Sequence, residues 1–347
     1  MQEKINFAFG NSRFYMSHLI TDKSSGKQLT VAIRASGERT EDLCRELILE
    51  QGVPEENIYF VKESPFSKTL FKSLELGKEK GLPWLFCVDA DLLLRPGSVS
   101  TLLAYARKQP EKVCEIQGFV FDKFFGGPRP GGVHLYRTKL IPELMEALSE
   151  VKETIRPEYH TLLLMKERGF PYTVVPFVVG LHDYEQYYKD IYRKCFVHGV
   201  KHLNLAGYFR EIWGSKASED PDFFVAIQAF ADGFRHNGEV AIDHQQEIFS
   251  KGFNNIQQQE KPLLQKNDFD KKAINQLIQN WAPSPAYLTQ FNHVYDFLQQ
   301  KNLKIRIKDS MKNKGIFRTM LYYSGRALEK VGFELIKKGD SKKGAHQ

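Results

Sequence analysis

Hydrophobic positions between residues 28 and 179 alternate between two spacings. Short apolar or β-branched runs predict strands, and stretches in which apolar residues recur every three or four positions predict helices. The predicted strands are Leu29–Ile33, Asn57–Val61, Trp84–Val88, Cys114–Phe121, Val133–Tyr136 and Tyr172–Val179. The predicted helices are Glu41–Gln51, Ser67–Lys80, Ser98–Lys108 and Ile141–Val151. This alternation predicts an α/β fold with a mostly parallel, Rossmann-like sheet flanked by helices.

The pattern changes after His182, where the spacing becomes helical for most of the chain. Helices are predicted at Tyr184–His198, Asp222–Phe234, Lys271–Trp281 and Leu288–Gln300. Gly126–Gly132 contains four Gly and two Pro and is predicted to be a loop. The polar stretch Asn254–Gln259 is predicted to be a surface loop. We therefore expect an α/β part up to about residue 200, followed by a mainly helical region.

Charge is concentrated in the last part of the chain. The net charge is +7, and residues 301–347 hold 13 Lys or Arg against 4 Asp or Glu, so the first 300 residues are close to −2. Apolar residues recur at helical spacing from Lys312 to Lys338, with basic residues beside them. This predicts either a helix on an anionic membrane surface or a helix packed on its own domain. Nucleic acid is not expected to be a partner, because the aromatic residues lie mostly on the apolar face.

The composition is typical of a soluble globular protein, with 42% hydrophobic and 26% charged residues. No apolar run approaches the roughly 20 residues that span a bilayer. The first residues do not have the pattern of a secretory signal. Four scattered cysteines indicate free thiols in a reducing compartment. These features predict a cytoplasmic protein, with peripheral attachment to the inner face of the membrane if the basic tail binds lipid.

Two carboxylates stand directly after a predicted buried strand. Asp89 and Asp91 follow Trp84–Val88, and ligands of α/β sheets bind outside the carboxyl ends of the strands. Two such acids repel each other unless a cation or hydrogen-bond donors compensate them. A hard divalent ion bridging to phosphate oxygens is a natural compensation. The alternative is that the two acids only cap the following turn.

Three segments together resemble a known family. Leu85–Asp91, followed by Pro96 and Gly97, resembles the DXD region of family-two-like glycosyltransferases of the GT-A fold. Gly131–Arg137 resembles the Gly-Gly segment that lines their sugar pocket, and Val179–Asp183 resembles their closing segment. The resemblance covers about residues 28–200. It implies a nucleotide-sugar-binding and catalytic domain at 1–200, a helical region at 201–300 that binds an acceptor or forms oligomers, and a basic amphipathic tail at 301–347.

The resemblance also implies a metal site. Asp91 would ligate Mn²⁺ or Mg²⁺, which bridges the two donor phosphates and so makes Asp91 essential to catalysis. Asp89 would contact the ribose, or the metal through water. His182 would be a third protein ligand, with Asp183 as the competing candidate.

Further roles follow from the same resemblance. Glu158, which opens a helix predicted at Leu162–Lys166, would be the base that takes the acceptor proton. It has no neighbouring acid, and the alternative is a helix-opening glutamate favoured by the helix dipole. The remaining predicted donor-binding residues are Arg34, Ser36, Glu63, Gly131 and Gly132.

The function implied is transfer of a sugar, hexosyltransferase-like, from a nucleotide-sugar to a hydroxyl. A UDP- or GDP-sugar would be the donor, and a glycan or lipid-linked molecule would be the acceptor, in glycan or glycolipid biosynthesis. Two alternatives remain open at this stage. One is another metal-dependent phosphate enzyme, a phosphatase or nucleotidyltransferase. The other is a non-catalytic binding protein on a degenerate transferase core.

Overall fold

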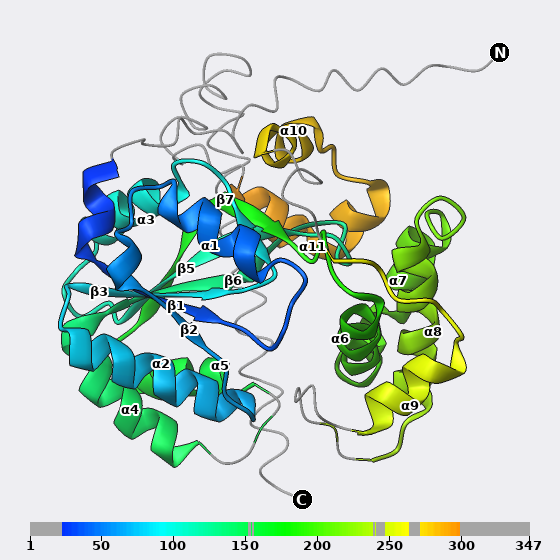
Figure 1. Cartoon of the computed structure of the whole chain (residues 1–347), viewed down its shortest axis with the longest axis horizontal. Coiled ribbons are helices and arrows are strands. Elements are labelled where there is room, and N and C mark those ends of the chain that lie inside the picture. Colours follow the sequence, from blue (N-terminus) through cyan, green and yellow to red (C-terminus); the bar gives the residue numbers. More distant parts are fainter. Residues whose placement is uncertain are drawn as a thin grey trace, which may run out of the picture. The chain divides into compact units, whose positions relative to one another are not determined.

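The computed structural model (Figure 1) describes residues 23–151, 154, 156–238, 240, 247–263 and 271–298. The chain divides into two units, residues 1–298 and 299–347, and the description below concerns the first. The predicted basic tail at 301–347, with its 312–338 segment, lies outside the described residues. Among the described helices, none is both long and apolar enough to cross a bilayer.

Seven strands form one sheet in the order β2-β1-β3-β6-β5-β7-β4. Their bounds are β1 Leu29–Arg34, β2 Ile58–Val61, β3 Trp84–Asp89, β4 Leu92–Leu94, β5 Glu115–Asp122, β6 Gly127–Arg137 and β7 Tyr172–His182. Strands β1 and β2, β1 and β3, and β5 and β7 pair in parallel, whereas β6 and β4 run antiparallel to their neighbours. A four-residue connection from β5 to β6 permits only antiparallel pairing. The predicted α/β class is confirmed, with a sheet that is mixed in direction.

Helices cover both faces of the sheet (Figure 1). One face carries α1 (Glu41–Leu49) and α3 (Ser98–Ala106), and the other carries α2 (Phe66–Lys80), α4 (Ile141–Glu150) and α5 (Pro157–Glu167). Alternation along the strands explains the two cores. Val31 and Ile33 of β1 pack in the core under α1 and α3, whereas Ala32 packs in the core under α2 and α4. Because both faces are buried, four of the six residues of β1 are apolar.

Beyond the sheet the chain is helical, as predicted. The helices are α6 Tyr188–Lys201, α7 Ala206–Gly214, α8 Pro221–Arg235, α9 Glu247–Asn255, α10 Lys271–Asn280 and α11 Pro285–Leu298. Short 3₁₀ turns lie at Lys23–Gln28, Glu55–Asn57, Thr138–Leu140 and Leu203–Leu205. Helices α6 to α9 share an aromatic-rich core, and α6 crosses α8 closely, since a Cβ on Gly199 would lie 2.4 Å from the Phe230 carbonyl oxygen. Helices α10 and α11 contribute to the core under α1 and α3.

The prediction of a loop over Gly126–Gly132 was wrong, because β6 begins at Gly127 and pairs with β5 through this stretch. Pro128 and Pro130 lie opposite Phe121 and Phe119. The other neighbour, β3, pairs with β6 only from Val133 onward. Residues 127–132 are therefore paired on one side only, and a proline on an open strand edge loses no ladder hydrogen bond. The pattern also missed β4, α7 and α9, which are short.

Candidate metal and nucleotide site

A cavity lies where β1, β2 and β3 end. The carboxyl ends of these parallel strands meet at one edge of the sheet, which is where ligands of such folds bind. Four residues predicted to bind the donor line this cavity, namely Arg34, Ser36, Glu63 and Asp89. Its remaining lining residues are Ala35, Glu38, Ser64, Phe66, Thr69, Asp91, Arg193 and Lys194.

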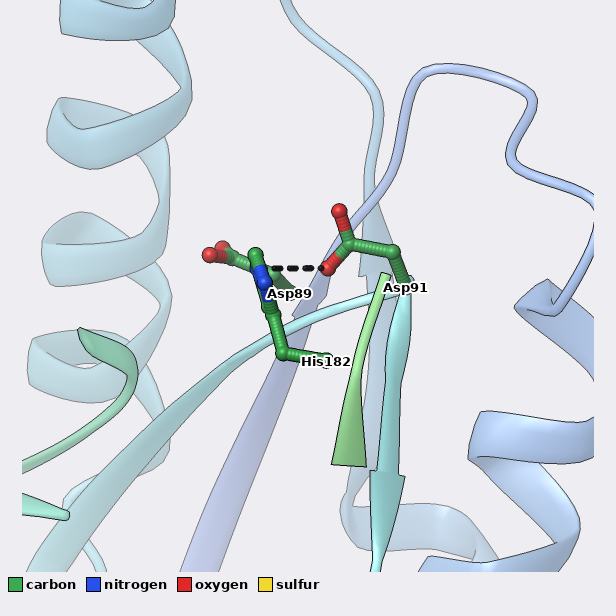
Figure 2. Close-up of side chains that lie close together, drawn as sticks. All are labelled: Asp89, Asp91 and His182. Carbon is green, nitrogen blue, oxygen red and sulfur yellow. Dashed lines mark ion pairs between the residues drawn. The ribbon is translucent and has the colours of Figure 1, made fainter. Parts of the chain in front are cut away.

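Figure 2 shows Asp89, Asp91 and His182 close together, with an ion pair between His182 and Asp91, and one ligand atom from each residue lies within 4.8 Å of the others. Asp89 is the last residue of β3, and His182 is the last residue of β7. Strand β4 pairs antiparallel with β7, with Leu92 opposite His182. This pairing brings a histidine to an aspartate ninety-one residues earlier in the sequence.

The donor set at this point suits a hard divalent cation. Oδ1 of Asp91 is buried and has no hydrogen-bond partner among the described residues, and it faces His182 Nε2 at 3.4 Å (Figure 2). A buried carboxylate oxygen left without a partner is costly, and a cation would satisfy it. His182 Nδ1 lies 2.9 Å from both Asp122 Oδ2 and Asp183 Oδ2, which orients Nε2 toward Asp91. Asp89, Asp91 and His182 therefore fit Mn²⁺ or Mg²⁺.

Protonation of His182 competes with such a cation. Burial favours the neutral ring, but the carboxylates of Asp183 and Asp91 outweigh burial and raise the pKa of His182 to about 10. A ligating histidine must be neutral, so a metal ion would displace this proton.

Asp183, the competing candidate ligand, is already engaged. It has a left-handed backbone with φ of 65°, uncommon for a non-glycine residue. Its oxygens contact His182 Nδ1 and Lys194 Nζ. A second possible group, Asp122 with His182 and Asp183, is also satisfied, because Asp122 accepts from Arg129 Nε at 2.6 Å and from two backbone amides at 2.9 Å. The geometry favours the group that contains Asp91.

Sequence reasoning missed four site residues, namely Asp122, Arg129, Arg193 and Lys194. Nζ of Lys194, on α6, contacts both Asp91 Oδ2 and Asp183 Oδ1. Burial opposes its charge, but these two carboxylates raise the pKa of Lys194, so the amine stays an ammonium ion. Asp122 ends β5, and a strand-end acid was the signal that could have identified it. Lys194 had no comparable signal, since it lies within a helix.

Glu158, predicted to be the base, does not line the cavity. It accepts hydrogen bonds from Arg34 Nη1 at 2.7 Å and from the Tyr136 hydroxyl at 2.5 Å, and His134 Nε2 lies 3.1 Å from its other oxygen. Arg34 Nε in turn donates to Asp89 Oδ1 at 2.8 Å. Burial opposes ionisation of Glu158, but Arg34 and His134 outweigh it and hold its pKa below the ordinary value. The geometry therefore favours a positioning role for Glu158, which holds Arg34 in place, and not the role of a base.

The remaining predicted donor-binding residues differ in their placement. Ser36 lines the cavity, but its amide and hydroxyl both donate to Glu38, each at 2.6 Å. Gly131 and Gly132 lie in β6 and do not line the cavity. Gly132 has a φ of 72°, and a Cβ there would lie 2.8 Å from Leu92 Cδ1 and 3.3 Å from the His182 ring. Gly132 thus allows β6 to approach Leu92 and the candidate ligand His182 closely.

No family model matches this chain, and no curated protein matches it. The solved structures that resemble this chain include sugar and nucleotide transferases. A glycosyltransferase involved in glycosylating the major capsid of PBCV-1 matches at 13% identity, over 44% of this chain and 92% of that chain, with a TM-score of 0.33. The mannosyltransferase PcManGT from Pyrobaculum calidifontis, in complex with GDP-Man and Mn²⁺, matches at 11% identity, over 80% and 87%, with a TM-score of 0.35. A cytidylyltransferase from Leptospira borgpetersenii matches at 8% identity, over 55% and 95%, with a TM-score of 0.29.

These likenesses are too distant to assign an activity to this chain. The functional assignment therefore rests on the cavity and on the group of Asp89, Asp91 and His182.

Proposed function

We propose that this chain is a metal-dependent glycosyltransferase of the GT-A type, which moves a sugar from a nucleotide-sugar to a hydroxyl acceptor. The observation that carries the proposal is the buried Asp91 Oδ1, which has no hydrogen-bond partner among the described residues. It lies beside His182 and lines a cavity at the carboxyl ends of three parallel strands. A site that needs both a cation and a phosphorylated ligand explains this combination.

Different residues of the cavity would bind different parts of the donor. Glu63, at its rim, would accept a hydrogen bond from the nucleotide base. Asp89, whose side chain is 30% exposed and is held by Arg34, would accept from the ribose hydroxyls. Arg193 and Lys194 line the same cavity and would donate to the diphosphate.

Mn²⁺ or Mg²⁺ held by Asp91 and His182, with Asp89 directly or through water, would neutralise charge on the departing nucleoside diphosphate. Lys194 contacts Asp91 and Asp183, so it would lie next to the same phosphates. The ammonium group of Lys194 would thus add a second positive charge, besides the metal ion, that stabilises the negative charge on the leaving group.

The test is calorimetric titration with UDP, GDP, CDP and dTDP, in Mn²⁺ and again in EDTA. We expect one diphosphate to bind only with the metal, and Asp91→Asn to lose that binding while remaining folded. Asp42→Asn, an exposed acid on α1, is the matched control and should bind as the unmodified chain does. Metal-independent binding, or equal binding by Asp91→Asn, would refute the metal site. Preference for nucleoside triphosphates would favour a nucleotidyltransferase.

The acceptor belongs to the same proposal. A glycan or lipid-linked hydroxyl would be used, and the 312–338 segment would hold the chain on an anionic membrane at its cytoplasmic face. Cosedimentation of the full chain with phosphatidylserine vesicles, but not with neutral vesicles, is expected. Replacing Arg318, Arg326 and Lys330 with Gln should abolish it, because each basic residue near such a surface contributes about 1 kcal/mol. Unchanged cosedimentation would contradict the membrane role of this segment.

A further inference from the structure

Positively charged and imidazole side chains gather around one aromatic ring beside the metal-binding residues. The rings of His198 and His202 lie edge-on to Phe125, with centroids 5.2 and 5.7 Å away. The Arg129 guanidinium lies 5.1 Å from the same ring centroid. Arg156 Nη2 approaches His202 Nε2 at 3.5 Å. Together with Lys201, the last residue of α6, these side chains form what we call the α6 basic cluster.

Counter-charges are scarce in this cluster. Among the described residues, no carboxylate forms an ion pair with Lys201, Arg156 or His202, whereas Arg129 is neutralised by Asp122. The electrostatic field at Lys201 comes from Arg156, Arg129 and Arg193, all cationic. Burial, reinforced by these three guanidinium groups, lowers the pKa of Lys201 to about 7. Burial with Arg156 and Lys201 likewise lowers the pKa of His202 to about 4, so this ring is neutral.

Such an arrangement is unfavourable for the protein by itself. A half-buried lysine that feels the charges of Arg156, Arg129 and Arg193, and that pairs with no carboxylate among the described residues, loses stability through desolvation and repulsion. An anion would remove both penalties and restore the ammonium charge of Lys201. With Lys201 protonated, Arg156 and Lys201 would present two positive charges that no carboxylate among the described residues pairs with, and a phosphate monoester, with close to two negative charges at neutral pH, matches them. The guanidinium fork of Arg156 also matches phosphate geometry.

The position of the cluster indicates which substrate would carry that phosphate. Arg156, Lys201 and His202 do not line the nucleotide cavity. Arg129 connects the cluster to the metal-binding residues, since its Nη2 lies 3.4 Å from His182 Nδ1. Lys201 follows Lys194 by seven residues on α6, which corresponds to about 10 Å along the helix axis. A phosphate at Lys201 would thus lie roughly one or two sugar rings from the point of transfer.

We propose that the α6 basic cluster binds a phosphate group on the acceptor, so that the enzyme selects phosphorylated acceptors. This inference rests on the proposed transferase function. The donor diphosphate occupies the cavity with Arg193 and Lys194, and the acceptor phosphate occupies the cluster with Arg156 and Lys201.

The experiment titrates the full chain with inorganic phosphate by calorimetry, after saturation with Mn²⁺ and the nucleoside diphosphate that it binds. Saturation fills the diphosphate site, so added phosphate reports on the cluster. We expect phosphate to bind, and Lys201→Gln and Arg156→Gln each to weaken it about tenfold, as expected for the loss of a charge-assisted hydrogen bond. Lys189→Gln, which removes an exposed charge from the first turn of α6, is the control and should bind as the unmodified chain does.

Other outcomes separate the alternatives. No phosphate binding to the saturated chain, or equal binding by Lys201→Gln, would overturn the inference while the donor titration still stands. Tighter binding of acetate than of phosphate would replace the phosphate assignment with a carboxylate. Failure of every nucleoside diphosphate to bind would instead overturn the transferase proposal and, with it, the acceptor role of the cluster.

Two further measurements complete the test. Thermal unfolding of Lys201→Gln should not fall below that of the unmodified chain, since the substitution relieves repulsion; a marked fall would assign Lys201 a structural role. Vesicles containing phosphatidic acid distinguish the source of the phosphate. If the chain binds these vesicles and the binding depends on Lys201, the phosphate is carried by a lipid. If the chain binds free phosphate through Lys201 but does not bind the vesicles, the acceptor is soluble.

Discussion

Glu158 provides the sharpest test of how this site is built, because two roles for it predict opposite results. As a base it would take a proton from the acceptor and contribute little to folding. In the structure it accepts from Arg34 and Tyr136 and contacts His134, and its side chain is only 12% exposed. Glu158→Gln keeps the shape and one acceptor oxygen but removes the charge.

The expected cost follows from what the substitution leaves behind. Arg34 has a side chain only 3% exposed, and after the substitution it retains Asp89 as its sole carboxylate partner among the described residues. Removing one member of a buried ion pair costs about 3–5 kcal/mol. Because the amide oxygen can still accept one hydrogen bond, we expect a loss of about 3 kcal/mol, at the lower end of that range.

Urea unfolding measures this loss as a lower midpoint with an unchanged slope. Glu63→Gln is the matched control, since Glu63 lines the same cavity but is exposed, and its free energy of unfolding should stay within about 0.5 kcal/mol. The pH dependence adds a second check. The pKa of Glu158 is lowered in the folded state, so its stabilisation is present above the ordinary glutamate value of about 4.3 and is lost as the pH falls through the lowered value. The difference in the free energy of unfolding between Glu158→Gln and the unmodified chain should therefore disappear in acid.

One result would refute the reasoning. If Glu158→Gln unfolds at the same urea concentration as the unmodified chain and only transfer is lost, Glu158 acts chemically. The structural role inferred from its contacts would then be wrong.

Two other substitutions test the proposed metal site. Lys194→Met should weaken binding of the nucleoside diphosphate about tenfold while Mn²⁺ still binds, because the variant lacks the ammonium group that would contact the phosphates. Lys189→Met is its control. Unchanged affinity of Lys194→Met for the diphosphate, measured by calorimetry, would exclude a phosphate role for Lys194. Gly132→Ala should lower the free energy of unfolding by about 1–3 kcal/mol and weaken Mn²⁺ binding, since the added Cβ would meet Leu92 and crowd His182 at a left-handed backbone. Gly37→Ala, also left-handed but with nothing within 4 Å of its Cβ, separates the backbone penalty from the clash; equal Mn²⁺ binding by both variants would contradict the crowding.

Local patterns in the sequence predicted the strands and helices of the α/β part and located Asp89 and Asp91 at a strand end. Both features depend on residues that are neighbours in the chain. The prediction of Glu158 as a base did not foresee its pairing with Arg34, which lies 124 residues away. The contact of Lys194 with Asp91 joins residues 103 apart, and no spacing in the sequence indicates it. The loop prediction for Gly126–Gly132 failed because the composition of a segment does not show that one of its edges is free of a partner strand.

The short strand β4 also has a consequence for how the protein matures. Its three residues hold Asp91 beside His182 only when β7, made some ninety residues later, has added to the sheet. A chain still emerging from the ribosome up to residue 150 would contain the paired aspartates but no complete cation site. A divalent ion would then bind the finished fold and not its precursors, stabilising it by about 2.7 kcal/mol at a concentration of 100 times the dissociation constant. Loading with the ion would thus act as a checkpoint that favours completely synthesised and correctly assembled molecules.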